Sequence, residues 1–467
     1  MRAQLENKVI LLSGSFLLLC LLYYTFGFLL HRSQTVMLLL SYAGLWLLSW
    51  PWLNTSKSAS KNPVKHWKID LLVGLLFRVL LLFSWPNLSQ DVYRFLWDGA
   101  LFAQGISPYL YLPADIASLQ HFSEISIPNS EQLLNAMGAL SAGNYSNYPP
   151  IKQLIFALPH FLNIQELIFQ ISTLRVILIL GDVGVFLLGR QLLEKLSINS
   201  RYINWYFLNP FIILELTGNC HFEGLMALSI MAGLVLLIQG RFLRSGGLLG
   251  IAVGIKLIPL MLIPIIGAYI GSQFKSRQMI LPLFWFGMGL IGTIGLVFLP
   301  FLNAETITHY TNTTGLWFTK FEFNASFYYL LRWLGFQWKG YNIIAQLGPA
   351  LSVISTLFIF YLSYRVLIKK SALYSALMGA VIIYLLCATT VHPWYWTTVL
   401  ILSILAQRRI GLLASFLVFL SYTAYGNESV QEQSLWLFIE YFILIGYLLW
   451  EIKTTHGQKP HCPDQST

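Results

Sequence analysis

The sequence predicts an all-α polytopic membrane protein. Of its 467 residues, 56% are apolar and only 10% are charged, whereas an ordinary soluble domain has roughly a quarter of its residues charged. Apolar runs of about 18 residues or more recur from one end to the other, and each is long enough to cross a bilayer as a helix. These observations exclude water-soluble, fibrous and disordered classes.

About twelve transmembrane helices are expected from these runs. The first run, 9–30, is too long for the core of a signal peptide, and no small-residue cleavage pattern follows it, so we interpret it as the first span. The expected spans are 9–30, 36–53, 69–86, 172–193, 203–217, 222–240, 280–301, 343–366, 373–390, 394–406, 410–425 and 434–452.

The apolar segment 245–273 differs because Lys256, Pro259 and Pro264 interrupt it. Cations flank it on both sides, which favours a re-entrant hairpin that enters and leaves on the cytoplasmic side, with Lys256 near its tip. An ammonium in an apolar segment needs a partner or an anionic ligand. The alternative is that Lys256 snorkels to the cytoplasmic surface.

Cations indicate the orientation of the chain. Of the 29 lysines and arginines, 20 lie on the side that holds both termini, 6 on the other side and 3 within apolar segments. The positive-inside rule therefore places both termini in the cytoplasm. The net charge of +10 follows from this topology, so nucleic acid is not an expected partner.

Four regions follow from this topology. Residues 1–86 form N-terminal transmembrane helices, and 87–150 form an extracytoplasmic loop with five acids against Arg94. Residues 151–452 form a helical core that contains a second extracytoplasmic loop, 302–340. A cytoplasmic tail, 453–467, follows.

The first loop opens with SQDVYRFLWDG. Ser89 is a suitable helix N-cap and Gly105 a suitable stop. On that helix Asp91 and Asp98 project within about 20° of each other, beside Arg94. We expect an amphipathic helix flat on the outer membrane surface, whose carboxylates face water or a cleft and can accept a proton. Alternatively, the three charges form an exposed ladder that only stabilises the helix.

Other polar residues gather at expected span ends. The turn ELTGNCHFEG could bind a ligand, bind a metal or cap the next helix, and the aromatics of TTVHPWYW could form an interfacial belt, a role that suits Trp394 best. The four cysteines lie far apart, in no metal or disulfide spacing. These polar candidates are Asn219, His221, Glu223, Glu322, Asn324, His392, Trp394 and Tyr395.

The order DVYRFLWDG, GISPYLY, YPP, NPFIILELTGNCHFEG, GIKLIPL, FEFNAS and VHPWYW resembles the polyprenyl-phosphate-sugar-dependent glycosyltransferases of superfamily C (GT-C), especially bacterial mannosyltransferase-like proteins, over most of 70–400. The resemblance implies that Asp91 is the general base and Asp98 the second acid, although the chain has single aspartates where the GPI mannosyltransferase catalytic subunit has an Asp-x-Asp pair. The substrate-binding residues that it implies are Arg94, Tyr109, Tyr148, Asn219, His221, Glu223, Lys256, Glu322, Asn324, Arg332, His392, Trp394 and Tyr395.

The resemblance also implies a hexose, in particular mannose, as the transferred sugar, a lipid or glycan as acceptor, and no cofactor. Lys256, His392 or Arg332 would hold the donor phosphate without an obligatory metal, and the first loop would cover a cleft floored by His221, Glu322 and His392. The alternative class is a transporter or flippase, but transporters concentrate charge near the bilayer midplane in repeated helices. The absence of a Gly-rich nucleotide loop disfavours a cytosolic nucleotide-sugar enzyme.

Overall fold

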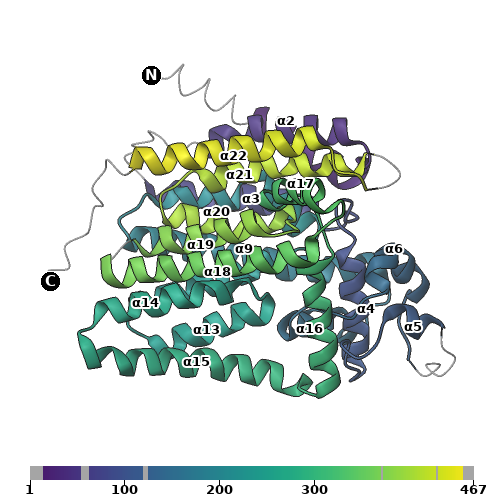
Figure 1. Ribbon diagram of the computed structural model, residues 1–467. Coiled ribbons are helices and arrows are strands. Elements are labelled where there is room, and N and C mark those ends of the chain that lie inside the picture. Colours follow the sequence, from purple (N-terminus) through teal and green to yellow (C-terminus); the bar gives the residue numbers. More distant parts are fainter. Residues whose placement is uncertain (1–13, 54–62, 119–124, 370–371, 427–429, 456–467) are drawn as a thin grey trace. The chain divides into compact units, whose positions relative to one another are not determined.

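A computed structural model of the chain describes residues 14–53, 63–118, 125–369, 372–426 and 430–455 (Figure 1). The described residues are helical apart from turns and connections, and the one pairing of β type among them is an isolated bridge between Phe323 and Thr390. The all-α prediction is confirmed. The chain divides into two compact units, 1–260 with 280–322, and 261–279 with 323–467.

The first unit contains a helix over Gly14–Leu29, part of which is the π-helix η1 (Thr25–Leu29). Its other helices are α2 (Thr35–Leu53), α3 (Pro63–Leu80), α4 (Asp91–Ala103), α5 (Pro113–Ser118), α6 (Ser130–Ala142), α7 (Pro150–Phe156), α8 (Leu158–Phe161), α9 (Leu167–Lys195), η3 (Ser200–Ile203), α10 (Asn204–Phe207), α11 (Pro210–Ile212), η4 (Ile213–Gly218), α12 (Glu223–Ile238), α13 (Phe242–Ile255), α15 (Ile280–Phe298), η7 (Leu299–Phe301) and α16 (Ala304–Thr319).

Within this unit α12 packs against α9 and α13, and α13 and α15 lie side by side (Figure 1). Two buried arginines in apolar helices have polar partners, as a charge among apolar helices requires. Arg78 donates to Asp182 at 2.9 Å, and Arg175 donates to backbone carbonyls described below. These contacts hold α3 and α9 together.

The expected span 203–217 is wrong as a continuous helix. The segment instead forms η3, α10, α11 and the π-helix η4, none longer than six residues. Pro210 begins α11 because a proline lacks the N–H that a helix interior needs. After η4 the chain bends by 112° into α12, so 210–238 is one broken segment.

The second unit contains mostly C-terminal helices. They are α14 (Ile263–Gln273), η6 (Ser276–Met279), α17 (Phe327–Lys339), α18 (Ile344–Lys369), α19 (Leu373–Cys387), η8 (Pro393–Tyr395), α20 (Trp396–Leu405), α21 (Ile410–Leu417), η9 (Val418–Tyr425) and α22 (Ser434–Thr455). Here α18 packs against α14 and α19, and α21 packs against α20 and α22.

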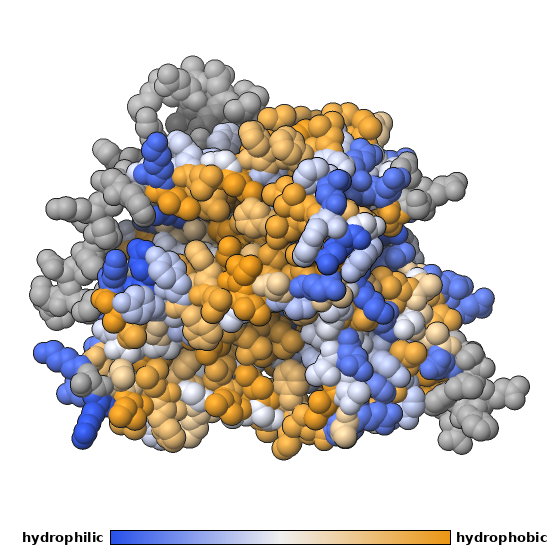
Figure 2. All heavy atoms as spheres, in the orientation of Figure 1, coloured by the Kyte–Doolittle hydropathy of each residue, from blue (hydrophilic) through white to orange (hydrophobic). Residues whose placement is uncertain are grey.

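Within the part of the chain that the structure describes, five helices are long and apolar enough to cross a membrane: Thr35–Leu53, Leu167–Lys195, Arg277–Phe301, Ile344–Lys369 and Ser434–Thr454. Six shorter apolar helices accompany them. Figure 2 shows apolar side chains along the middle of helices such as α15 and α18, with hydrophilic side chains nearer their ends. The chain is therefore an integral membrane protein of the polytopic class.

The segment 245–273 is interrupted where the sequence predicts it. Helix α13 ends at Ile255, Lys256 has an extended backbone with φ −156° and ψ 145°, and the 3-10 helix η5 (Ile258–Leu262) precedes α14. A re-entrant path for this segment, the count of about twelve crossings and the four regions stay predictions. Most of the expected tail 453–467 lies outside the described residues.

Candidate active site

The acidic helix of the first loop forms as the sequence predicts. Helix α4 begins at Asp91, so its N-cap is Gln90, without a side-chain cap, and the expectation that Ser89 is the N-cap is wrong. The Ser89 hydroxyl still accepts from the Asp91 N–H at 3.2 Å. The helix ends at Ala103, and Gly105 then adopts φ +76°, which a glycine tolerates without steric cost. Its first residue therefore has a fixed position at the helix N-terminus.

The prediction that this helix lies flat on a membrane surface is wrong. Helix α4 packs against α6, α7 and α8, and every residue from Arg94 to Leu101 is buried. At Gly99 the α7 backbone comes so close that a Cβ atom would lie 2.1 Å from the carbonyl oxygen of Phe156. The apolar face meets protein instead of lipid, because loop residues 130–161 fold over it.

Asp98 is fully buried and surrounded by donors. It accepts hydrogen bonds from Arg94 Nε at 2.6 Å, Ser146 Oγ at 2.6 Å and Gln153 Nε2 at 3.3 Å. Arg94 also donates to the carbonyls of Ser141 and Asn144. The exposed-ladder alternative is wrong, since this cluster ties α4 to the end of α6 and to α7.

Asp91 lies in a different environment, where four helices bring charges together. Lys152 comes from α7, Glu223 is the first residue of α12, and Lys256 follows the last residue of α13. Loss of water contact raises the pKa of Asp91 to about 6, while Lys152 and Lys256 oppose this rise and Glu223 adds to it. We call these four residues the charged centre.

Lys256 has the partner that its burial requires. Its ammonium donates to the carboxylate of Glu223, which is 2% exposed, while Lys256 itself is 19% exposed. The alternative that Lys256 snorkels to a membrane surface is wrong, because the ammonium lies in an ion pair inside the first unit.

Lys152 was not among the candidates from sequence. Its ammonium is 4.7 Å from the centroid of the Tyr148 ring, and the rings of Phe95, Phe222 and Phe156 lie 5.2 to 5.9 Å away. Aromatic faces attract a cation in such a cage. Burial lowers the pKa of Lys152 to about 8, and the carboxylate of Glu223 is the main opposing influence. The sequence pattern that could have indicated this cage is YPPIKQLIF, which has an aromatic residue four positions before and another four positions after the lysine.

The bend before α12 positions Glu223. Cys220 has φ +61°, and the buried His221 lies with Nε2 3.8 Å from Oε2 of the buried Glu215. Asn219 accepts from the Leu88 N–H at 3.0 Å and donates to the Leu214 carbonyl at 2.9 Å. The amide of Asn219 thus ties this bend to the segment that leads into α4.

Arg175 reinforces the same connection. Its guanidinium donates to the carbonyls of Thr217 at 2.9 Å and Gly218 at 2.5 Å, and also to those of Leu82 and Ser84. One buried side chain of α9 therefore satisfies carbonyls of the bend and of the segment before α4.

Tyr109 and Tyr148 support the loop. The Tyr109 hydroxyl donates to the Tyr148 carbonyl at 2.7 Å. The Tyr109 carbonyl oxygen lies 3.0 Å from His309 Nδ1. The Tyr148 ring packs edge-on against Phe95 with centroids 4.9 Å apart. Tyr109 thus holds the backbone of the residue whose ring cages Lys152.

In the second unit the FEFNAS and VHPWYW motifs lie together. The Phe323 N–H donates to Thr389, and the Val391 N–H donates to Phe323 at 2.7 Å. His392 stacks on Trp394 with centroids 4.6 Å apart, on Phe323 at 5.2 Å and edge-on against Tyr395 at 5.6 Å. Trp394 is 8% exposed, so its expected place in an interfacial belt is wrong.

Asn324 is held by C-terminal residues. It adopts φ +45°, its N–H donates to Glu432, its side chain donates to Glu440 at 3.0 Å, and its carbonyl accepts from Tyr441 at 2.5 Å. The guanidinium of Arg332 lies 4.4 Å from the centroid of the Tyr329 ring. Asn324, Arg332, His392, Trp394 and Tyr395 belong to the second unit, whereas Glu322, half-buried, ends the first.

The described residues contain no group of three or more His, Cys, Asp or Glu side chains that could hold a metal ion. His221 and Glu223 therefore form no such group with other described side chains. The charged centre instead holds two ammonium groups beside two carboxylates, which suits an anionic substrate group and a proton acceptor.

A family model described as alpha-(1->6)-mannopyranosyltransferase, N-terminal domain, matches residues 21–272, more than half of the chain. The chain belongs to this family. The match covers all four members of the charged centre and the bend before α12, whereas the motifs of the second unit from Phe323 onward lie outside it.

Curated relatives have the same family name. The chain is 25% identical over 254 residues to alpha-(1->6)-mannopyranosyltransferase A of Corynebacterium glutamicum, covering 52% of this chain and 47% of that protein. It is 22% identical over 310 residues to alpha-(1->6)-mannopyranosyltransferase A of Mycobacterium tuberculosis, covering 66% and 56%. The chain thus spans about half the length of these relatives.

Proposed function

We propose that this chain is an integral-membrane mannosyltransferase that moves mannose from a polyprenyl-phosphate-linked donor to a lipid or glycan acceptor. Membership of the alpha-(1->6)-mannopyranosyltransferase family supports the transferase class over a transporter or flippase. The observation that carries the proposal is the charged centre, where Asp91 lies beside Lys152, Lys256 and Glu223.

In the proposed reaction, the Asp91 carboxylate accepts the proton of the acceptor hydroxyl as that oxygen attacks the anomeric carbon. The bond from this carbon to the donor phosphate breaks, its electron pair leaves with polyprenyl phosphate, and the configuration inverts. A pKa of about 6 leaves Asp91 mostly ionised at neutral pH and makes it a stronger base than an ordinary aspartate.

Fixed positive charge would stabilise the leaving phosphate without an obligatory metal. Lys256 and Lys152 supply that charge in the first unit, and His392 and Arg332 are further candidates in the second. The leaving group is already a stable anion, so ammonium groups that are positioned before the reaction can serve where a divalent ion otherwise would.

We propose that Asp98 positions α4 and does not exchange protons with substrate. Its contacts with Arg94, Ser146 and Gln153 support this role, because they occupy both oxygens of a carboxylate that is fully buried. Asn219 and Tyr109 act in the same way, through the backbone that they hold, and Tyr148 acts through its ring, which lies against Lys152.

The test of the function is transfer by the purified full chain in detergent. Radiolabelled polyprenyl-phosphate mannose, polyprenyl-phosphate glucose and GDP-mannose are each offered with an alkyl mannoside acceptor. We expect transfer from polyprenyl-phosphate mannose and an α-(1→6) linked product. Transfer from GDP-mannose alone would contradict the donor class. Activity that a chelator abolishes and Mg²⁺ or Mn²⁺ restores would contradict metal independence.

The proposal also places the loop 87–150 outside the cell and both termini in the cytoplasm, with about twelve crossings. In a variant whose four native cysteines are replaced, a single cysteine at position 118 should react with an impermeant maleimide on intact cells, and one at position 58 should not. The reverse labelling would overturn the orientation and with it an extracytoplasmic charged centre.

A further inference from the structure

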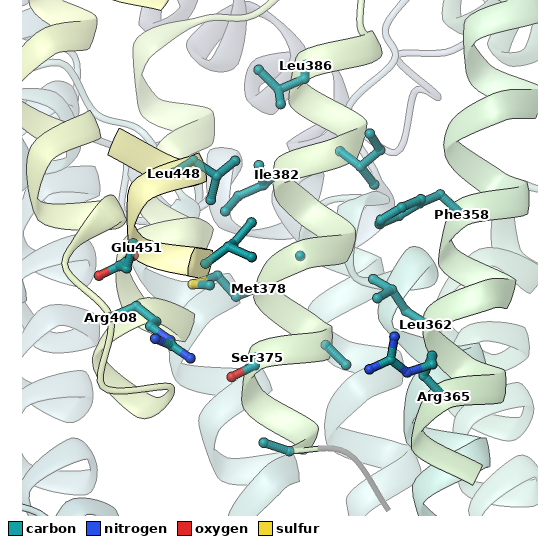
Figure 3. Close-up of a pocket in the computed structure, with 15 residues that line it drawn as sticks. Phe358, Leu362, Arg365, Ser375, Met378, Ile382, Leu386, Arg408, Leu448 and Glu451 are labelled. Atoms are coloured by element: carbon teal, nitrogen blue, oxygen red, sulfur yellow. The ribbon is translucent and has the colours of Figure 1, made fainter. Parts of the chain in front are cut away.

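The second unit contains a cavity of 350 Å³ among α18, α19, α22 and the turn between α20 and α21 (Figure 3). This volume lies within the range of ~300–1,000 Å³ that is common for small-molecule sites. The cavity is lined by fifteen residues, of which Arg365, Ser375, Arg408 and Glu451 are the polar members. None of the residues proposed for mannosyl transfer lines it.

Polar and apolar lining residues separate along the cavity. Arg365 lies near the C-terminal end of α18, Ser375 near the start of α19, and Glu451 near the C-terminal end of α22. Figure 3 shows Arg365 and Arg408 on opposite walls, with Ser375 between them, whereas Leu386 lies at the far end. The cavity is thus apolar along its length and basic at one end.

The charges at the basic end favour an anion. Two guanidinium groups oppose the single carboxylate of Glu451, which accepts from the Arg409 N–H at 2.7 Å. Arg365 donates to the Tyr361 hydroxyl at 3.0 Å, which holds the guanidinium at the wall of the cavity. A phosphate can accept hydrogen bonds from such guanidinium groups at little further cost in side-chain ordering.

Two walls of the cavity come from candidate transmembrane helices. Both α18 and α22 are long and apolar enough to cross a membrane, and basic pockets between transmembrane helices bind the head groups of anionic lipids. An apolar cavity with a basic end matches a molecule that has a hydrocarbon tail and a phosphate.

We infer that this cavity binds one anionic glycerophospholipid of the bilayer, with its phosphate at Arg365 and Arg408 and an acyl chain along Met378, Ile382 and Leu386. On the proposed topology this lipid comes from the cytoplasmic leaflet. The site goes beyond the proposed transferase function, because it would bind a lipid that is neither donor nor acceptor.

The test is lipid retention by the purified full chain in native mass spectrometry. Phosphatidylglycerol, phosphatidylcholine with the same acyl chains, and polyprenyl phosphate are each added in detergent. We expect one retained phosphatidylglycerol, at least tenfold tighter binding than for phosphatidylcholine, and no displacement by polyprenyl phosphate. Equal retention of the two phospholipids, or retention of polyprenyl phosphate alone, would overturn the inference.

Different variants test the basic end and the apolar part of the cavity. Arg365→Gln with Arg408→Gln should weaken phosphatidylglycerol binding at least tenfold, and Gly379→Leu should block the apolar part, where a Cβ atom would have only Leu362 at 3.4 Å. Lys453→Gln is the matched control, since this exposed cation lies at the same end of α22 but does not line the cavity. Wild-type binding by the double variant would refute the site. Lipid binding is measured separately from mannosyl transfer, so a failure of the lipid-site inference leaves the proposed function unaffected.

Discussion

Two carboxylates on α4, seven residues apart and on one side of the helix, lie in opposite environments. Asp98 accepts from Arg94, Ser146 and Gln153 and is inaccessible. Asp91 is half-buried, lies among charges from three other helices, and its pKa is raised to about 6. The same residue type on the same helix thus has its oxygens held by donors at one position and lies among charged groups at the other.

The donors around each carboxylate distinguish the two positions, although both belong to the same sequence motif. The donors around Asp98 occupy both of its oxygens, whereas burial beside incompletely compensating charge makes Asp91 a better base than an ordinary aspartate. Asp98 therefore suits a role in holding α4 against α7, and Asp91 suits proton transfer.

The largest effect is expected at Asp91. Asp91→Asn keeps the size of the side chain but removes its basicity, so mannosyl transfer should fall by about 10²–10⁴. The measurement is the initial rate of transfer from polyprenyl-phosphate mannose by purified variants at equal concentration. Asp115→Asn is the matched control, since Asp115 is an exposed acid of the same loop, and its rate should stay within about twofold. Near-normal transfer by Asp91→Asn would move the role of base to Glu223 or Glu322.

A smaller effect of a different kind is expected at Asp98. Asp98→Asn leaves the Arg94 guanidinium buried without its anionic partner, so unfolding should become easier by about 3 kcal/mol. The measurement is thermal unfolding of the purified protein in detergent, at a pH where the wild type is stable.

The control for Asp98 is an exposed pair with the same spacing. Arg190 and Glu194 form an i,i+4 ion pair at 3.2 Å in which Glu194 is 55% exposed, and Glu194→Gln should cost under about 0.5 kcal/mol because water screens such pairs. Equal losses for Asp98→Asn and Glu194→Gln would mean that burial does not distinguish the two carboxylates.

Much of the fold could be predicted from the sequence because hydropathy and helix boundaries are local. The start of α4 at Asp91, the turn at Gly105 after it and the break at Lys256 follow from single residues and their neighbours. The burial of α4 could not be predicted from its own periodicity, because α6, α7 and α8, which follow later in the chain, pack against it. An amphipathic pattern alone does not distinguish lipid from protein as the apolar neighbour.

The candidate site was predicted in part for the same reason. Asp91, Glu223 and Lys256 belong to motifs in which a charge stands out against apolar neighbours. Lys152 does not stand out in this way, because its aromatic cage takes Phe95 and Phe222 from helices that only the fold brings together. Similarly, the ties from Arg175 to two separate segments are long-range contacts without a sequence pattern.

The smallest effect is a change in the pH dependence of transfer, and it tests whether the charged centre works as a unit. Below pH 6 protonation of Asp91 removes the base, and above pH 8 deprotonation of Lys152 removes a positive charge, so kcat/KM should be bell-shaped with limbs near these values. Lys152→Arg keeps the charge in the aromatic cage at all accessible pH values. This variant should retain transfer within about tenfold at pH 7 and lose the alkaline limb, while the acid limb stays near pH 6. A wild-type profile that stays level up to pH 9 would mean that the charge of Lys152 does not contribute to transfer, and Lys256 would then be the remaining cation of the centre.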